Sequence, residues 1–279
     1  MKLNHIIVPT DFSETATLAL QFATILAKKA NSKIHLVHIY KVPYAHTDSP
    51  DTSLVIDSAA HTKVRDQIKS QVGVLLAEPF MQGITVETHF LADMEPWEFI
   101  EHIKIDAGLI VMGTHGSKGN IWNSWMGTNT ERVIRKAKVP VLTVPIGSVI
   151  DSIKRILFAT DFQDSLDGIF PQIVSFTKLF QARLDVACII TPANYATSKW
   201  TNEQYKLLKE KYSDVDMHGF IYNDVSVEDG IAHICADENI DMIVMLTHGR
   251  TGFLHLVKGS IAESVSQHIK TPLLTFKPV

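Results

Sequence analysis

The chain has 279 residues, about twice the length of an ordinary domain, so we expect two domains. Hydrophobic residues make up 46% of it and charged residues 20%, a balance typical of a globular protein and not of a disordered one. The formal net charge is −4, no apolar run approaches the ~18 residues of a membrane span, and there are only two cysteines. These features argue against nucleic-acid binding, a membrane span and a disulfide scaffold, and they predict a cytoplasmic protein.

Strands and helices alternate along the first half of the chain. Short apolar runs bounded by turn residues predict strands at 5–9, 33–40, 84–91, 108–113 and 141–144. Apolar residues at helical spacing predict helices at 14–30, from about 58 to 81, at 96–105 and at 128–138. The polar, proline-bearing stretch 42–57 is predicted as a loop. Strands that alternate with helices predict right-handed βαβ units and a parallel, doubly wound α/β sheet.

Three sequence blocks occur twice, in the same order. They are HIIVPTDF (5–12) and RILFATDF (155–162), IVMGTHG (110–116) and IVMLTHG (243–249), and VPVLTVP (139–145) and TPLLTFK (271–277). The interval falls from 150 positions for the first block to 133 for the second, so the second copy is about 17 residues shorter between its second and fourth strands. We therefore predict two copies of one domain, at 1–147 and 151–279.

A two-fold relation between the copies makes a further prediction about the last strand of each. Isologous pairing joins the same edge of both copies, so strand 141–145 should lie antiparallel to strand 272–276. This pairing would also cover two otherwise exposed sheet edges.

The repeated blocks put polar residues and glycines after the first and fourth strands, where parallel sheets bind ligands. Asp11 and Asp161 follow the first strands. Gly113, Gly116 and Gly127-Thr128 follow the fourth strand of the first copy, and Gly249 and Gly259-Ser260 follow that of the second. Glycines let the backbone approach a phosphate, and a helix start favours an anion. The same residues also suit plain turns and helix N-caps, so both interpretations stay open.

The ordered combination of these motifs resembles the universal stress protein domain. In each copy a strand ending in Asp is followed by a strand ending Val-Met-Gly-Thr-His-Gly (first copy) or Val-Met-Leu-Thr-His-Gly (second copy). A Gly-Thr or Gly-Ser helix start and a last apolar strand come next, and the two copies cover nearly the whole chain. The resemblance implies two tandem Rossmann-like (adenine nucleotide alpha hydrolase-like) domains, each a five-stranded parallel sheet of order 3-2-1-4-5 with helices on both faces. It also implies an intramolecular pseudo-dimer joined through the fifth strands, and leaves a homodimer of chains open.

The resemblance further implies an adenine nucleotide, ATP or AMP, as ligand, with no covalent cofactor. In the first copy, the residues implied to face the base and ribose are Asp11, Ile39 and Met112, and those implied to hold the phosphates are Gly113, Gly116, Gly127, Thr128 and Asn129. The second-copy equivalents are Asp161, Ile189, Met245, Gly249, Gly259, Ser260 and Ile261. Nucleotide-binding members of that family carry Gly-x2-Gly-x9-Gly-Ser/Thr in this loop, and each copy departs from the pattern once. The first copy has ten residues in place of nine, and the second has Leu246 in place of the first glycine. The first copy is slightly favoured.

Three functions compete at this point. A nucleotide-binding stress or signalling protein, with at most slow ATP hydrolysis, is favoured over an interaction module with vestigial glycine loops. An adenylating enzyme would need an SGGxDS-type loop or HxGH and KMSKS-type motifs, which the chain lacks. No catalytic residue is assigned. No metal is expected either, because His35 and His38 point to opposite faces of a strand and no HExxH spacing occurs.

Overall fold

The computed structural model describes residues 2–45, 55–95, 97–114, 127–247 and 269–277. In the first half the strands are β1 (His5–Pro9), β2 (Lys33–Tyr40), β3 (Tyr44–Ala45), β4 (Val55–Ile56), β5 (Val86–Ala92), β6 (Leu109–Gly113) and β7 (Val141–Val144). The helices of this half are α1 (Glu14–Ala30), α2 (Ser58–Leu76), α3 (Phe99–His102) and α4 (Gly127–Lys136), with a 3₁₀ turn at Pro79–Met81.

The second half repeats this order with a shorter middle. Its strands are β8 (Arg155–Ala159), β9 (Arg183–Ile190), β10 (Met217–Asn223), β11 (Met242–Leu246) and β12 (Leu273–Phe276). Its helices are α5 (Phe170–Phe180), α6 (Ser198–Lys211) and α7 (Val227–Asp237). The middle is shorter because α6 has 14 residues where α2 has 19, and because the first half alone inserts the β3–β4 pair among the described residues.

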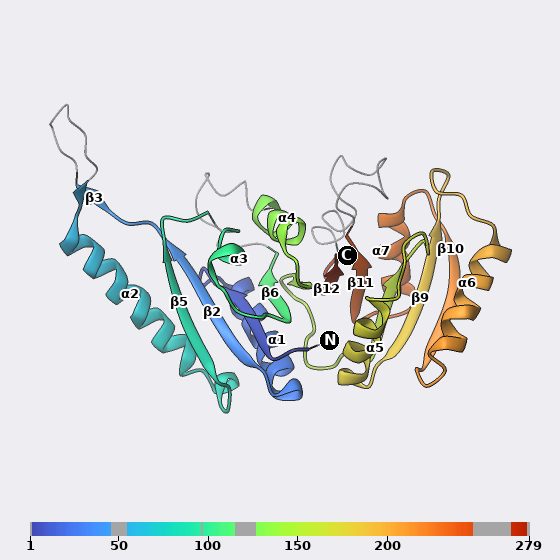
Figure 1. Ribbon diagram of the computed structural model, residues 1–279, viewed down its shortest axis with the longest axis horizontal. Helices are drawn as coiled ribbons and strands as arrows, with labels where there is room; N and C mark the ends of the chain where they lie inside the picture. The colour runs from blue at the N-terminus through green and yellow to red at the C-terminus, as the bar shows by residue number, and fades with distance from the viewer. Residues whose placement is uncertain (1, 46–54, 96, 115–126, 248–268, 278–279) are drawn as a thin grey trace.

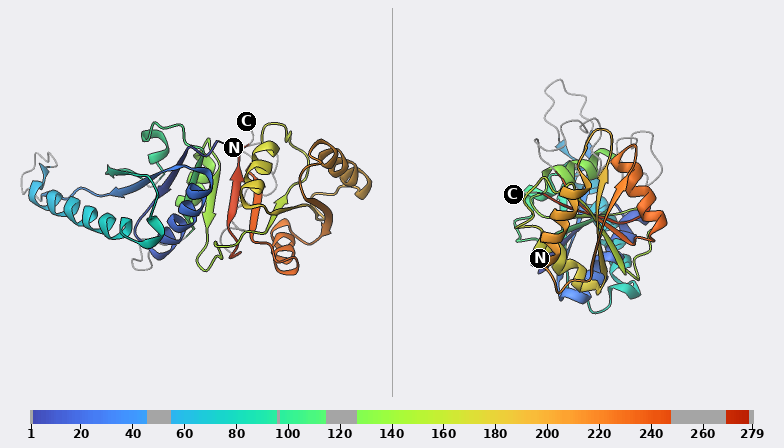
Figure 2. Two further views of the ribbon diagram at one scale, coloured as in Figure 1. Left: turned by 90° about the horizontal axis from the view of Figure 1, so that it is seen from below. Right: turned by 90° about the vertical axis from the view of Figure 1, so that its right-hand side faces the viewer.

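All ten long strands form one sheet, in the order β10-β9-β8-β11-β12-β7-β6-β1-β2-β5. Each half therefore has the strand order 3-2-1-4-5, which confirms the predicted architecture of two Rossmann-like domains. Figure 1 shows the halves side by side, with α2 and α6 toward opposite ends, and Figure 2 shows helices on both faces of the twisted sheet.

The two halves join through β7 and β12, which pair antiparallel as predicted. Leu142 and Leu274 lie directly opposite one another and are fully buried. On either side of them, the Thr143 hydroxyl donates to the Leu273 carbonyl at 3.3 Å and the Thr275 hydroxyl donates to the Val141 carbonyl at 3.1 Å. These matching bonds are what an approximate two-fold axis through the junction requires.

A continuous apolar core on one face of the sheet also crosses the junction. It includes Phe22 of α1, whose ring meets that of Phe180 of α5 edge-on at 6.2 Å. The predicted domain limits, 147 and 151, fall in the connection between β7 and β8 and stay a prediction.

Local sequence explains most element boundaries. Helix α1 begins after Ser13, whose hydroxyl accepts a hydrogen bond from the Ala16 amide, and ends at Asn31, which adopts the left-handed conformation. β1, α1, β2 and β7 have the predicted limits.

Three predicted helices differ in their limits from those observed, and the one predicted at 128–138 runs from Gly127 to Lys136. The helix predicted to reach residue 81 ends at Leu76, and Pro79 then starts a 3₁₀ turn. The helix predicted at 96–105 is reduced to Phe99–His102, because Ile103 turns to an extended conformation and buries its side chain. Part of the predicted loop 42–57 pairs as β3 with β4.

Candidate functional site

The repeated Thr-Asp-Phe sequence forms a tight turn at the carboxyl end of the first strand. The Thr10 hydroxyl accepts from the Phe12 amide, and an Asp11 carboxylate oxygen accepts from the Ser13 amide, both at 3.0 Å. Phe12 has φ of 61°, a conformation that a bulky residue rarely adopts. The same two bonds and a φ of 57° at the phenylalanine recur at Thr160, Asp161, Phe162 and Gln163. The turn is therefore a property of the repeated sequence, and it presents an aspartate at the same place in both halves.

A pocket of about 180 Å³, here called the first pocket, opens beside this turn in the first half. It is lined by Pro9, Thr10, Asp11, Ser13, Thr15, Ala16, Val37, Ile39, Met112, Gly113, Thr114, Asn129 and Thr130. It lies between the carboxyl ends of β1 and β6, where the strand order reverses. Apolar side chains with a few polar groups among them are typical of small-molecule sites.

The start of α4 is held beside the first pocket. The Thr130 hydroxyl lies 3.4 Å from the Gly113 carbonyl and 3.5 Å from the Thr114 carbonyl, and donates to both at the long end of hydrogen-bonding distance. Helix α4 therefore has its amino end, where backbone N–H groups and the helix dipole favour anions, next to an apolar cleft.

Gly113 is needed for packing, whatever the pocket binds. A Cβ at this position would lie 2.9 Å from the backbone of Thr15, in the first turn of α1. The end of β6 thus approaches α1 too closely for a side chain. In the second half α5 starts only at Phe170, so the position that corresponds to Thr15 precedes the helix. That difference leaves room for Leu246, which packs on the core and lines the second pocket.

The second pocket, of about 30 Å³, lies at the equivalent place in the second half. Its lining residues are Ala159, Thr160, Asp161, Asp164, Ile189, Asn194, Val227, Met245 and Leu246. Asn194, one of these residues, is held in place by two hydrogen bonds: its side-chain oxygen accepts from the Thr191 amide, and its NH₂ group donates to the Ile189 carbonyl. The second pocket is thus much the smaller of the two.

The predicted site residues fall into three groups. Those that line a pocket are Asp11, Ile39, Met112, Gly113 and Asn129 in the first half, and Asp161, Ile189 and Met245 in the second. Gly127 and Thr128 form the start of α4. Gly116, Gly249, Gly259, Ser260 and Ile261 lie outside the described residues. Sequence reasoning missed the hydroxyl residues of this pocket, which follow β1 and β6 directly or lie at the starts of α1 and α4: Thr10, Ser13, Thr15, Thr114 and Thr130.

The halves also differ at the residue of the second strand that packs against the Thr-Asp-Phe turn. In the first half, His38 Nδ1–H donates to the Thr10 carbonyl at 2.8 Å, and its ring lies against Phe12 with centroids 4.6 Å apart. In the second half, Cys188 takes this place and is buried. Burial raises the pKa of the Cys188 thiol, and raises that of Cys235 to about 12. Both thiols are therefore protonated at neutral pH and are unsuited to nucleophilic chemistry.

Two Rossmann-like halves, each with a carboxyl-end pocket beside a Thr-Asp-Phe turn, define a tandem α/β protein with two unequal candidate ligand sites. The family model described as "Universal stress protein family" matches residues 2–145 and again 152–277. The chain belongs to the universal stress protein family. Among its described helices, none has the length and apolar character needed to cross a membrane.

Similar proteins agree with this assignment. Universal stress protein Slr1230 of Synechocystis is 23% identical over 303 aligned residues, covering 99% of this chain and all of that protein. Universal stress protein MJ0577 of Methanocaldococcus jannaschii is 29% identical and covers 50% of this chain and 93% of its own length. A solved universal stress protein of Archaeoglobus fulgidus superposes with a TM-score of 0.75 at 19% identity, covering 99% of both chains, and shares the tandem fold.

Proposed function

We propose that this universal stress protein binds an adenine nucleotide, ATP or AMP, in the first pocket, as part of a stress-response or signalling role. The observation that carries the proposal is the meeting of five predicted residues in one pocket: Asp11, Ile39, Met112, Gly113 and Asn129. The apolar side chains suit a base, the carboxylate suits a ribose hydroxyl or an exocyclic amine, and the start of α4 suits phosphates.

The unequal pockets support assigning the ligand to the first half. A volume of about 180 Å³ is open in the first half and about 30 Å³ in the second, where Leu246 and Asn194 occupy the equivalent region. We therefore propose one nucleotide per chain.

Asp11→Ala should weaken ATP or AMP binding by about 10- to 100-fold, through loss of one charged hydrogen bond to the ligand. The measurement is calorimetric titration of the full-length chain under one salt condition. Asp161→Ala makes the same change in the second half and should leave the affinity unchanged. Asp11→Asn keeps an oxygen for the Ser13 amide, so it separates loss of the ligand contact from loss of the turn. No nucleotide binding by the wild type would favour the alternative, an interaction module with vestigial glycine loops.

Leu246→Gly should open a second site and raise the stoichiometry from one nucleotide to two per chain. Its side chain lines the second pocket, and removing it enlarges that space at a cost in folding free energy of about 2–4 kcal/mol. Equilibrium dialysis gives the stoichiometry, and circular dichroism checks that the variant is folded. A folded variant that still binds one nucleotide would contradict the steric explanation.

A further inference from the structure

Three histidines from adjacent strands meet at the amino ends of the first-half strands, far from the first pocket. His5 Nδ1 lies 3.0 Å from His35 Nε2, and His35 Nδ1 lies 3.0 Å from His89 Nε2. A Glu87 carboxylate oxygen is 3.7 Å from His89 Nε2. Strand register explains the cluster: β2 and β5 pair His35 with Glu87 and Val37 with His89, which puts these side chains on one face.

The cluster is partly open to solvent. His35 is buried, with 2% of its surface exposed, whereas the side chains of His89 and Glu87 are 21% and 48% exposed. Burial, followed by the nearby His89, lowers the pKa of His35.

We propose that His35, His89 and Glu87 form a binding site for a divalent transition-metal ion, Zn²⁺ in particular. One ligand atom from each residue lies within 4.8 Å of the others. Two imidazole nitrogens at 3.0 Å have about the separation of neighbouring ligands around Zn²⁺, whose Zn–N bonds are about 2.0–2.1 Å. Two histidines and one carboxylate form a set that Zn²⁺ and related ions accept, with a fourth position left for water.

Two further residues would orient the ligands. With His35 Nδ1 on the ion, its Nε2–H is free to donate to His5 Nδ1, which fixes the ring and its tautomer. The other Glu87 oxygen accepts from Lys33 Nζ at 2.5 Å, which fixes the carboxylate. His5 and Lys33 are thus positioning residues, and the ion would join β2 to the edge strand β5.

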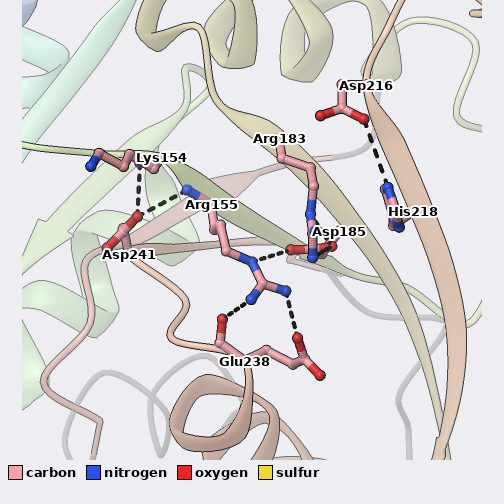
Figure 3. Close-up of polar contacts among 8 residues, drawn as sticks. All are labelled: Lys154, Arg155, Arg183, Asp185, Asp216, His218, Glu238 and Asp241. Atoms are coloured by element: carbon pink, nitrogen blue, oxygen red, sulfur yellow. Dashed lines mark hydrogen bonds and ion pairs between the residues drawn. The ribbon is translucent and has the colours of Figure 1, made fainter.

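In the second half, the positions equivalent to this cluster hold different side chains. By strand register, His5, Lys33, His35 and Glu87 correspond to Arg155, Arg183, Asp185 and His218. There Asp185 is buried and lies between the two guanidinium groups, with contacts of 3.0 Å to Arg155 and 2.8 Å to Arg183 (Figure 3). The fold therefore accepts an ion-paired cluster at this place, and the imidazole cluster is a feature of the first half alone.

The test is titration of the full-length, metal-free chain with Zn²⁺, followed by calorimetry, and with Co²⁺, followed by visible absorption. The wild type should bind one equivalent of Zn²⁺ that His89→Ala and Glu87→Gln lose. The Co²⁺ complex should show the intense visible bands of four-coordinate Co²⁺, and His89→Ala should lose them. His5→Phe, which keeps a ring but removes the nitrogen, should weaken Zn²⁺ binding by about 10- to 100-fold.

His218→Ala is the control, because it removes a histidine at the second-half position that corresponds to Glu87. It should keep the full equivalent of Zn²⁺. Circular dichroism in the presence of a chelator checks the fold of each variant, and the two altered ligands are partly exposed, so both variants should fold. A His89→Ala chain that binds Zn²⁺ with unchanged stoichiometry and affinity would overturn the proposal. So would a wild type that binds none, and the three imidazoles would then be a hydrogen-bonded counterpart of the Asp185 ion pairs.

Discussion

Replacing Asp185 by alanine should lower the free energy of unfolding by about 3–5 kcal/mol. The Asp185 side chain is 1% exposed and is the shared partner of Arg155 and Arg183. Arg155 is itself 22% exposed and also reaches the Glu238 carboxylate at 2.7 Å (Figure 3). Removing the buried carboxylate leaves two guanidinium groups facing one another without the charge between them, and Arg155 then keeps only the half-exposed Glu238 carboxylate to offset its desolvation.

Urea unfolding of the full-length chain, followed by circular dichroism, measures this loss. Asp214→Ala is the control, because Asp214 pairs with Lys178 at 2.5 Å on the surface, where their side chains are 68% and 53% exposed. It removes the same charge and should leave the unfolding midpoint unchanged, since exposed ion pairs contribute little. Equal midpoint shifts in the two variants would refute a special role for the buried cluster.

Leu142→Ala and Leu274→Ala should each lower the free energy of unfolding by about 2–5 kcal/mol. The two leucines are fully buried and directly opposite one another at the β7–β12 junction. Each truncation leaves a cavity where the cores of the two halves meet. Because the side chains occupy one shared space, the double variant should lose less than the sum of the single losses, with a coupling of about 0.5–3 kcal/mol.

The measurement is a double-mutant cycle in urea. Leu207→Ala, on the exposed face of α6 with 61% of its surface accessible, is the control for removal of a leucine and should change little. Additive losses in the double variant would show that the two leucines do not share one packing site, and would argue against a tightly packed junction.

Much of the fold could be predicted from local sequence patterns. The repeated Thr-Asp-Phe and Val-Met-x-Thr-His-Gly blocks identified the duplication, and apolar periodicity located β1, α1, β2 and β7 at their observed limits. These features depend on residues a few positions apart, so the sequence contains them directly. The two-fold argument also predicted the antiparallel β7–β12 junction, because joining the same edge of two identical copies permits no other arrangement.

The candidate site was predicted less completely. Asp11, Ile39, Met112, Gly113 and Asn129 were identified through family resemblance, and they line one pocket. The reason for Gly113 was not visible in the sequence, because it depends on how closely β6 approaches α1. The room for the Leu246 side chain beside the second pocket depends on where α5 starts, which is a matter of packing between segments far apart in the chain.

The sequence by itself determined the α/β class, the duplication, the strand order through the resemblance, and the position of the Asp11 and Asp161 turns. Only the tertiary structure decided the shortening of α3, the pairing of β3 with β4, and the meeting of His5, His35 and His89. Whether side chains on three strands share one face depends on the register between strands that are 30 and 54 residues apart. Register is set by pairing and by packing against the helices, and no local periodicity records it.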